Sequence, residues 1–253
     1  MIMLKLIDIH KTFNPGTINE KVALNGVDLH LNEGDFVTVI GGNGAGKSTM
    51  LNAVAGAWPV DSGKIIIGGT DVTKLSEYKR AAYLGRVFQD PMTGTAATMG
   101  IEENLALAKR RGKSRLLRPG ITRQEREEYH ELLKILGLGL EDRLTSKVGL
   151  LSGGQRQALT LLMATLKKPQ LLLLDEHTAA LDPKTAAKVL EITDMIVNRD
   201  HLTTMMITHN MRDAITHGNR LIMMWEGKII LDIQGEEKKK LTVQDLLDKF
   251  EEA

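Results

Sequence analysis

The chain has 253 residues, of which 42% are hydrophobic and 26% are charged, as in a folded globular protein. Its 33 Lys and Arg against 32 Asp and Glu give a net charge of +1, which argues against a protein that wraps nucleic acid. Cysteine is absent, so disulfides, Cys-ligated zinc, iron–sulfur clusters and thiol catalysis are excluded. No window approaches the ~20 apolar residues that span a bilayer, and no secretion signal begins the chain, so we expect any membrane role to be peripheral.

The first quarter of the chain predicts two kinds of strand. Residues 4–10 and 22–31 alternate apolar and polar side chains, which predicts an antiparallel pair with one face on the core. Residues 36–40 are short, apolar and β-branched, as in a strand buried on both faces. A glycine-rich run follows, and we expect a helix from Lys47 to about Ala55, ended by Gly56.

Further strands are predicted at 84–88, 171–175 and 203–208, with helices between them, notably at 184–197. Strand, helix and buried strand in alternation indicate an α/β fold with a mixed, mostly parallel sheet that is covered on both sides. The end of the chain predicts a hairpin of residues 221–225 and 228–232, joined by Glu226-Gly227.

The middle of the chain differs, because helical patterns dominate it at 101–109 and at 123–136, the latter closed by Gly137. Thr242 is placed to cap a last amphipathic helix through Phe250. We therefore expect one domain, 1–253. Its parts are a core with an antiparallel β subdomain (1–90 and 150–235), an inserted helical subdomain (91–149) and a C-terminal helix (236–253).

The strongest motif is a complete G-x-x-x-x-G-K-S between the strand at 36–40 and the helix at 47–55. Glycines let successive backbone N–H groups point at one phosphate chain, and the following helix presents its positive end to it. Lys47 is then placed for the β- and γ-phosphates and the Ser48 hydroxyl for Mg²⁺. The alternative, a glycine-rich turn that happens to precede a lysine, does not account for the strand and helix around it. The motif indicates a P-loop NTPase core.

Asp175 and Glu176 end the apolar strand at 171–175, which places Asp175 at the carboxyl edge of the sheet, where open α/β folds bind ligands. Asp175 suits Mg²⁺ in the manner of a Walker B aspartate. Glu176 is placed to orient or deprotonate an attacking water. The alternative is two solvated acids at a strand end.

A third motif, Leu151-Ser152-Gly153-Gly154-Gln155, leads into a predicted helix from Gln155 to Leu166, whose N-terminus can hold a second anion. With this motif the sequence resembles the nucleotide-binding subunit of an ATP-binding cassette (ABC) transporter, of the stand-alone prokaryotic type. The resemblance runs from about residue 3 to residue 235 and rests on several motifs in order. A P-loop enzyme of another kind, such as a kinase, has no reason to contain residues 151–155.

The resemblance implies roles for four further residues. Gln89 resembles the Q-loop glutamine that contacts Mg²⁺ and senses the membrane partner; otherwise it is a polar residue at a strand exit. Asp182, in Ala180-Leu181-Asp182, resembles the D-loop at a dimer interface. His209 resembles the switch histidine that touches the γ-phosphate, and its alternative is a structural role. Phe13 resembles the aromatic platform for adenine, and its alternative is core packing.

The motifs and the resemblance together give three sets of site residues, with ATP and Mg²⁺ as cofactors. The catalytic residues are Lys47, Gln89, Glu176 and His209. The metal ligands are Ser48, Gln89 and Asp175. The nucleotide-binding residues are Phe13, Gly41, Gly42, Asn43, Gly44, Ala45, Gly46, Lys47, Ser48, Thr49, Ser152, Gly153, Gly154, Gln155 and Asp182.

The resemblance also implies partners. ATP is expected between the P-loop of one cassette and the Leu-Ser-Gly-Gly-Gln of another, in a head-to-tail homodimer or paired cassette in which both sites hydrolyse. We expect integral membrane permease subunits, an extracytoplasmic solute-binding protein in the same system, no nucleic acid, and a peripheral place on the cytoplasmic face of the cell membrane. Uptake of an amino acid or similar small organic solute is the first hypothesis. A cassette of an exporter and a soluble ABC ATPase with a non-transport role are the alternatives.

Two features do not follow from these motifs. His177 stands where the family usually has Pro; we interpret it as a tolerated loop residue, with a pH-sensitive contact as the alternative. A zinc role for it lacks a second ligand at suitable spacing. The run 109–118 holds six cations and no acid. It is either a solvated face or a site of attraction to anionic lipid headgroups.

Overall fold

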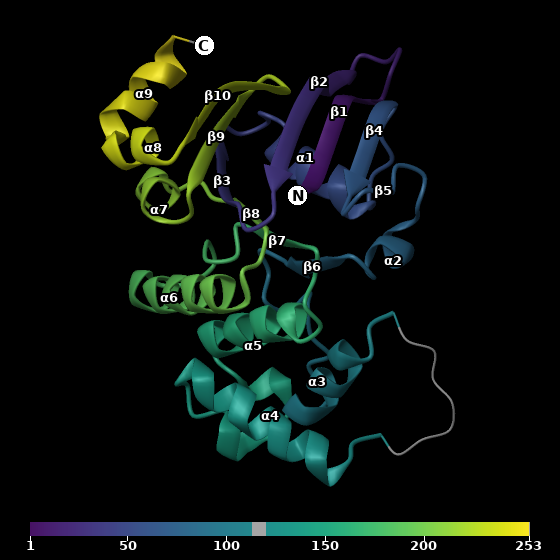
Figure 1. Cartoon of the computed structure of the whole chain (residues 1–253), viewed down its shortest axis with the longest axis vertical. Helices are drawn as coiled ribbons and strands as arrows, with labels where there is room; N and C mark the ends of the chain where they lie inside the picture. The colour runs from purple at the N-terminus through teal and green to yellow at the C-terminus, as the bar shows by residue number, and fades with distance from the viewer. Residues whose placement is uncertain (113–119, 253) are drawn as a thin grey trace.

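The computed structural model describes residues 1–112 and 120–252, which build two sheets with helices around them (Figure 1). The larger sheet has six strands in the order β10-β9-β3-β8-β7-β6. Five of them run parallel, and β10 pairs antiparallel with β9. The strands are β3 (Phe36–Gly41), β6 (Leu84–Val87), β7 (Leu171–Asp175), β8 (Thr204–Ile207), β9 (Arg220–Trp225) and β10 (Lys228–Gln234). The predicted α/β fold with a mixed, mostly parallel sheet is confirmed.

The smaller sheet is antiparallel and has the order β2-β1-β4-β5. Its strands are β1 (Ile2–Phe13), β2 (Lys21–Asn32), β4 (Ser62–Ile67) and β5 (Thr70–Asp71). The predicted pair of strands is present and longer than expected. β4 and β5 were not predicted, because β4 shows only the three isoleucines 65–67 and β5 only two polar residues.

The helices follow the predicted pattern where strong caps mark their ends. α1 (Lys47–Ala55), α3 (Ile101–Lys109) and α4 (Arg123–Leu136) have the expected bounds. α5 (Gly153–Thr165) begins two residues before the expected Gln155. The remaining helices are α2 (Glu77–Arg80), α6 (Pro183–Asp200), α7 (Met211–Thr216), α8 (Glu236–Lys240) and α9 (Val243–Glu251), with short 3-10 turns at Glu141–Arg143 and Val148–Leu150. Residues 236–252 thus form two helices rather than one.

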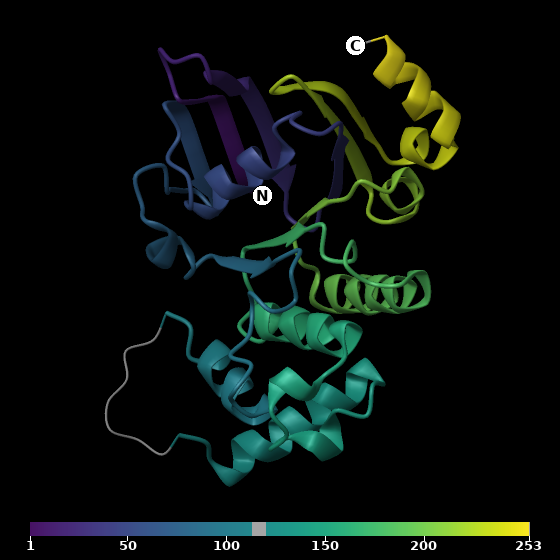
Figure 2. The ribbon, with the colours of Figure 1, turned by 180° about the vertical axis from the view of Figure 1, so that it is seen from behind.

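The larger sheet separates two layers of helices. Leu171 and Leu173 of β7 point into a cluster with α1 and the smaller sheet, whereas Leu172 and Leu174 point into a cluster with α5 and α6. This alternation follows from the two-residue period of a strand. Figure 2 shows the same order from behind, with α1 between the two sheets and α5 and α6 on the far side of β7. Helices α1 and α5 therefore lie on opposite faces of one sheet.

Arg80 fastens the C-terminal end of α1. Arg80 is 2% exposed, and its guanidinium donates to the carbonyl oxygens of Ala53 at 2.6 Å and Val54 at 3.0 Å. Two further bonds reach the carbonyls of Leu75 and Thr73. The last carbonyls of a helix have no partner within it, so a side-chain donor there satisfies them. The P-loop helix is therefore held at the end remote from the P-loop.

The C-terminal helices pack on the strand that leads to the P-loop. Leu246 of α9 is fully buried in a cluster with Ile40 of β3 and Met223 of β9. Lys238 of α8 is also buried, and its ammonium donates to the carbonyl oxygens of His217 and Gly218 at the end of α7. In the described residues, no helix is long and apolar enough to cross a membrane.

Candidate functional site

The P-loop joins β3 to α1 in the way that its glycines require. Gly46, the residue before α1, has a φ of +102°, and a Cβ at this position would lie 2.5 Å from the carbonyl oxygen of Ala23. Any other residue would be strained by its backbone and would clash with β2. Glycine at this position lets α1 begin against the start of β2, with its positive N-terminal end turned to the loop.

Lys47 is the first residue of α1, and its side chain lies against the loop. It is 7% exposed, and its Nζ donates to the carbonyl oxygens of Gly41 at 2.6 Å and Gly42 at 3.0 Å. Burial lowers the pKa of Lys47 below its usual value, while the charges of Glu176 and Asp175 act in the opposite direction. The structure thus places one cation between the P-loop backbone and the two acids that follow β7.

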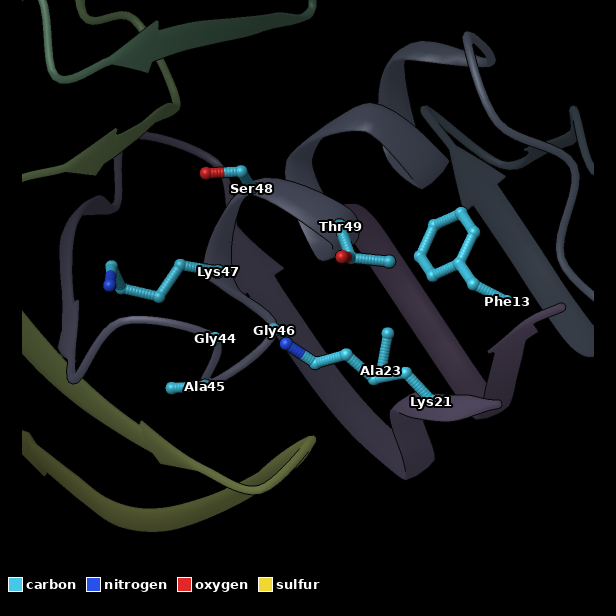
Figure 3. A pocket seen from close by; sticks show the side chains of 9 residues that line it. All are labelled: Phe13, Lys21, Ala23, Gly44, Ala45, Gly46, Lys47, Ser48 and Thr49. Atoms are coloured by element: carbon cyan, nitrogen blue, oxygen red, sulfur yellow. The ribbon is translucent and has the colours of Figure 1, made fainter. Parts of the chain in front are cut away.

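A pocket lies between the P-loop and the smaller sheet (Figure 3), with about 530 Å³ of empty volume. Phe13, at the end of β1, forms one wall, and its ring meets that of Trp58 edge-on at 5.2 Å between centroids. The aromatic wall and the loop are the two ends of one pocket. The other lining residues are Lys21, Ala23 and the P-loop residues Gly44, Ala45, Gly46, Lys47, Ser48 and Thr49.

Asp175 ends β7 and is mostly buried, with 17% of its side chain exposed. Burial raises its pKa, an effect that the nearby Arg86 guanidinium opposes. Arg86 Nη2 lies 3.7 Å from Asp175 Oδ2 and donates to Asn52 Oδ1 of α1 at 2.7 Å. Arg86 thereby links the acid at the end of β7 to the P-loop helix.

Glu176 and His209 meet although they are 33 positions apart in the sequence. Glu176 Oε2 lies 3.6 Å from His209 Nδ1. The parallel pairing of β7 with β8 sets Asp175 opposite Ile207, so the residues that follow the two strands leave the sheet together. Glu176 has a left-handed backbone, with φ at +43°, which is strained for a residue with a side chain. The turn that this conformation makes brings its carboxylate to the histidine.

Four segments from the larger sheet end at one edge. The P-loop follows β3, His209 follows β8, Asp175 and Glu176 end β7, and Gln89 follows β6, in the order of the strands in the sheet. Gln89 is exposed there, as are Asn43 and Ser48. This edge is where open α/β sheets bind ligands. No group of three or more His, Asp or Glu that could hold a metal ion occurs among residues 1–112 and 120–252.

The Ser152–Gln155 motif caps α5. Ser152 Oγ accepts from the Gln155 N–H at 3.3 Å, and Gln155 Oε1 accepts from the Ser152 N–H at 3.2 Å. A Cβ on Gly154 would lie 2.1 Å from Thr185 Cγ2 of α6, so the second glycine lets the two helices approach. Gly153 lies in the first turn, and a Cβ there would be 3.1 Å from the side chain of Leu181.

This motif and the P-loop are not joined in one site within the chain. α1 packs on one face of the larger sheet and α5 on the other, and none of Ser152–Gln155 lines the described P-loop pocket. Asp182 caps α6 beside the motif and accepts from the Thr185 N–H at 3.1 Å. The Thr185 hydroxyl and, after it, the Thr185 N–H lower the pKa of Asp182. The chain therefore carries two helix N-termini suited to anions on opposite faces of its sheet.

His177 is buried, with 2% of its surface exposed, and it bonds to Thr193 of α6. Burial lowers its pKa to about 4, with a smaller contribution from His217. The ring is therefore neutral at physiological pH, and the alternative of a contact that responds to pH near neutrality does not fit this placement.

The basic run is only partly described. Arg110 pairs with Glu125, and Arg111 donates to the carbonyl oxygens of Ala164 and Lys167. Lys109 pairs with Glu128. All three cations therefore have partners in the described residues. Residues 113–118, which complete the run after Gly112, lie outside the described residues.

Two residues of the site were not predicted. Lys21 lines the pocket, and Arg86 lies between Asp175 and Asn52. Lys21 opens a strand in an ordinary alternating pattern, so its sequence context gives no signal. Arg86 lies inside the predicted strand at 84–88, three residues before Gln89. A charged residue in a buried strand needs a partner, and this was the one signal in the sequence that pointed to its role.

Comparisons with known proteins agree with this geometry. The family model "ABC transporter" matches residues 24–179. The chain is 44% identical, over 99% of its length and the whole of the relative, to the tyrosine transport ATP-binding protein of Clostridioides difficile. It is 35% identical to a methionine import ATP-binding protein of Rhizobium etli, over 90% of this chain but 60% of that relative.

A solved structure is also similar. It is a dimeric post-hydrolysis state of an ATP-binding cassette bound to ADP and phosphate, 28% identical, with a TM-score of 0.77 over 92% of this chain and 98% of that one. The P-loop, the acids after β7 and the capped glycine motif of α5 lie in this chain as parts of the same fold. The chain belongs to the ABC transporter family, as an ATP-binding and ATP-hydrolysing subunit.

Proposed function

We propose that this subunit powers the uptake of an amino acid, with an aromatic amino acid such as tyrosine as the first candidate. The observation that supports this most is the 44% identity to a tyrosine transport ATP-binding protein over nearly the whole of both chains. The methionine import relative is in accord with amino-acid uptake, although this chain spans only 60% of that protein.

The nucleotide is assigned to the pocket of Figure 3. The adenine would stack on Phe13, and the phosphates would lie along the P-loop from Gly41 to Thr49, with Lys47 on the β- and γ-phosphates. The position of these groups supports the assignment, because an aromatic wall and an amide-rich loop with a cation stand at opposite ends of one pocket.

Mg²⁺ is proposed beside the phosphates, held by the Ser48 hydroxyl, the Asp175 carboxylate and the Gln89 amide oxygen. This donor set fits the ion, because Mg²⁺ prefers hard oxygen ligands and retains several waters. Bound there, it would neutralise charge on the β- and γ-phosphates.

Hydrolysis is assigned to Glu176 and His209. Glu176 would accept a proton from water as the water oxygen attacks the γ-phosphorus, and the bond to the leaving oxygen of ADP breaks, giving ADP and phosphate. His209 would donate a hydrogen bond to the γ-phosphate. The 3.6 Å between Glu176 Oε2 and His209 Nδ1 supports a shared task, since both would reach the same phosphate.

Two copies of the chain are proposed to complete each other. The P-loop and the Ser152–Gln155 motif lie on opposite faces of one sheet, so a head-to-tail pair would set each motif of one copy over the P-loop of the other, with Asp182 near the contact. The dimeric post-hydrolysis cassette is a precedent for such a pair. ATP would then close the dimer, and hydrolysis would release it.

The remaining partners are proposed from the family. They are transmembrane permease subunits, which Gln89 and the helical region of residues 91–149 would contact at the cytoplasmic face of the membrane, and a solute-binding protein on the other side. Closing and opening of the ATPase pair would move the permease, and the solute-binding protein would supply the amino acid.

The test combines purification with transport. Tagged chain is recovered from native membranes in mild detergent, and uptake of radiolabelled tyrosine is measured in cells that lack the chain or carry its Glu176→Gln variant. A co-purifying polytopic protein together with lost uptake supports the proposal. Recovery without a membrane partner, or a defect in export with uptake intact, overturns it.

A further inference from the structure

We propose that Lys21 is a second cation of the nucleotide pocket and binds the phosphate groups of ATP and ADP from the side of the P-loop that Lys47 does not occupy. This inference rests on the proposed assignment of the pocket to a nucleotide. It adds a binding residue that stands outside every motif of the sequence, in the first position of β2.

The geometry puts the Lys21 amine against the P-loop backbone. A methyl group placed on Gly44 would lie 2.8 Å from Lys21 Nζ. Lys21 also stands opposite Phe13 in the pairing of β1 with β2, so the strand register that places the aromatic wall places this lysine as well. Figure 3 shows its side chain running from that wall toward Gly44 and Gly46.

Lys47 and Lys21 approach the same loop from different sides. Lys47 Nζ is bonded to the carbonyl oxygens of Gly41 and Gly42, at the beginning of the loop. Lys21 Nζ lies by Gly44, near its middle. Between them runs a backbone whose following helix, α1, has nine residues and turns its positive end to the pocket. The spacing suits a chain of phosphates, which presents negative charge along its length.

Lys21 is exposed, and Glu226 lines a second pocket together with it. Lys11, the other lysine on the Phe13 wall, is neutralised by Asp61, with Nζ and Oδ1 2.9 Å apart. No salt bridge found among the described residues includes Lys21. Because Lys21 lines the pocket and makes no salt bridge within the described residues, its ammonium is available to an anion bound there.

This placement predicts different effects in the free and the bound protein. Lys21 is exposed and makes no salt bridge within the described residues, so removing its charge should leave the melting temperature of the nucleotide-free chain unchanged. The same change removes a charge-assisted hydrogen bond to phosphate, so nucleotide affinity falls. If Lys21 only shaped the pocket wall, replacing it would lower both the melting temperature and the nucleotide affinity.

The experiment uses the full chain and calorimetric titration with ATP and with ADP, without divalent cation so that hydrolysis does not interfere. The variants are Lys21→Gln, which removes the charge, and Lys21→Arg, which keeps it. Lys64→Gln is the matched control, because it makes the same charge change at an exposed position of β4, in the same sheet but outside the pocket. Each titration is repeated between about 50 mM and about 500 mM salt.

We expect Lys21→Gln to weaken ATP and ADP binding about tenfold at low salt, the lower end of what one hydrogen bond to a charged group contributes. We expect that difference to shrink at high salt, Lys21→Arg to remain close to wild type, and Lys64→Gln to bind normally. Unchanged affinity in Lys21→Gln, or a loss that salt does not alter and Lys21→Arg shares, overturns the role of Lys21. Absence of nucleotide binding by the wild-type chain would overturn the proposed function itself.

Discussion

His177 Nε2 and Thr193 Oγ1 form a buried hydrogen bond of 3.0 Å that ties the loop after Glu176 to helix α6. The Thr193 hydroxyl gives its proton to the carbonyl oxygen of Val189 at 2.8 Å, so it accepts from the ring. His177 is therefore the neutral tautomer with its proton on Nε2. The residue next to the proposed catalytic base is anchored through a side chain rather than through backbone rigidity.

His177 makes stability depend on pH below neutrality. Its pKa is about 4 in the folded chain, against 6.5 for the free group, so the unfolded chain binds more protons between these values. The contribution of the neutral His177 ring to the free energy of unfolding is fully present above pH 6.5. It is lost as the pH falls toward 4, by roughly 3 kcal/mol over 2.5 pH units. His177→Asn should make the free energy of unfolding, measured with urea, less dependent on pH between 4 and 6.5. The exposed His201→Asn serves as control, and a profile of wild-type slope in His177→Asn would contradict the prediction.

Thr193→Val should destabilise the chain by about 1–3 kcal/mol, because it leaves the buried Nε2–H of His177 without an acceptor. Thr193→Ser keeps the hydroxyl and should lose about 1 kcal/mol or less, from one methyl group. Denaturant unfolding at neutral pH compares the two. Equal losses in both variants would show that the methyl group, and not the hydrogen bond, matters at this position.

Glu176→Gln should lower ATP turnover at least about 100-fold while ATP still binds, because the amide cannot accept the proton of the attacking water. Steady-state phosphate release and ATP titration measure the two properties separately. Glu237→Gln, an exposed acid on α8, is the control for loss of a negative charge. Ordinary turnover by Glu176→Gln would remove Glu176 from the role of base.

Arg80→Lys should destabilise the chain by about 2–4 kcal/mol. An ammonium has fewer donors and a different shape, so it cannot satisfy the four carbonyl oxygens that the guanidinium now reaches, two of them at the end of α1. Thermal or urea unfolding measures the loss. Lys79→Arg, at the exposed neighbour, should have no comparable effect, and a wild-type stability of Arg80→Lys would contradict this account.

The sequence predicted the elements whose ends are set by local chemistry. Thr122 and Gly137 bound α4, and Gly46 and Gly56 bound α1, because caps act within a few residues. The start of α5 was placed two residues late, since glycines at 153 and 154 argue against a helix. Their reason is tertiary, as Gly154 admits Thr185 of α6.

The arrangement of the site was predictable where strand ends meet. The rule that open α/β sheets bind ligands at the carboxyl edge placed Asp175 there, and the resemblance added His209; the structure has both at the edge where the P-loop follows β3. Lys21 and Arg86 escaped prediction because their partners come from other strands and helices: Gly44 for one, Asn52 and Asp175 for the other. Whether the motif residues act as assigned stays a prediction.

The strand order of the larger sheet also bears on how the protein is made. β3, which carries the P-loop, leaves the ribosome early, yet both its neighbours, β8 and β9, lie between residues 204 and 225. A nascent chain that has not reached β8 therefore lacks both strands that pair with the P-loop strand. We therefore expect the P-loop to gain its final support, and Glu176 and His209 to join it, only when most of the chain has been synthesised.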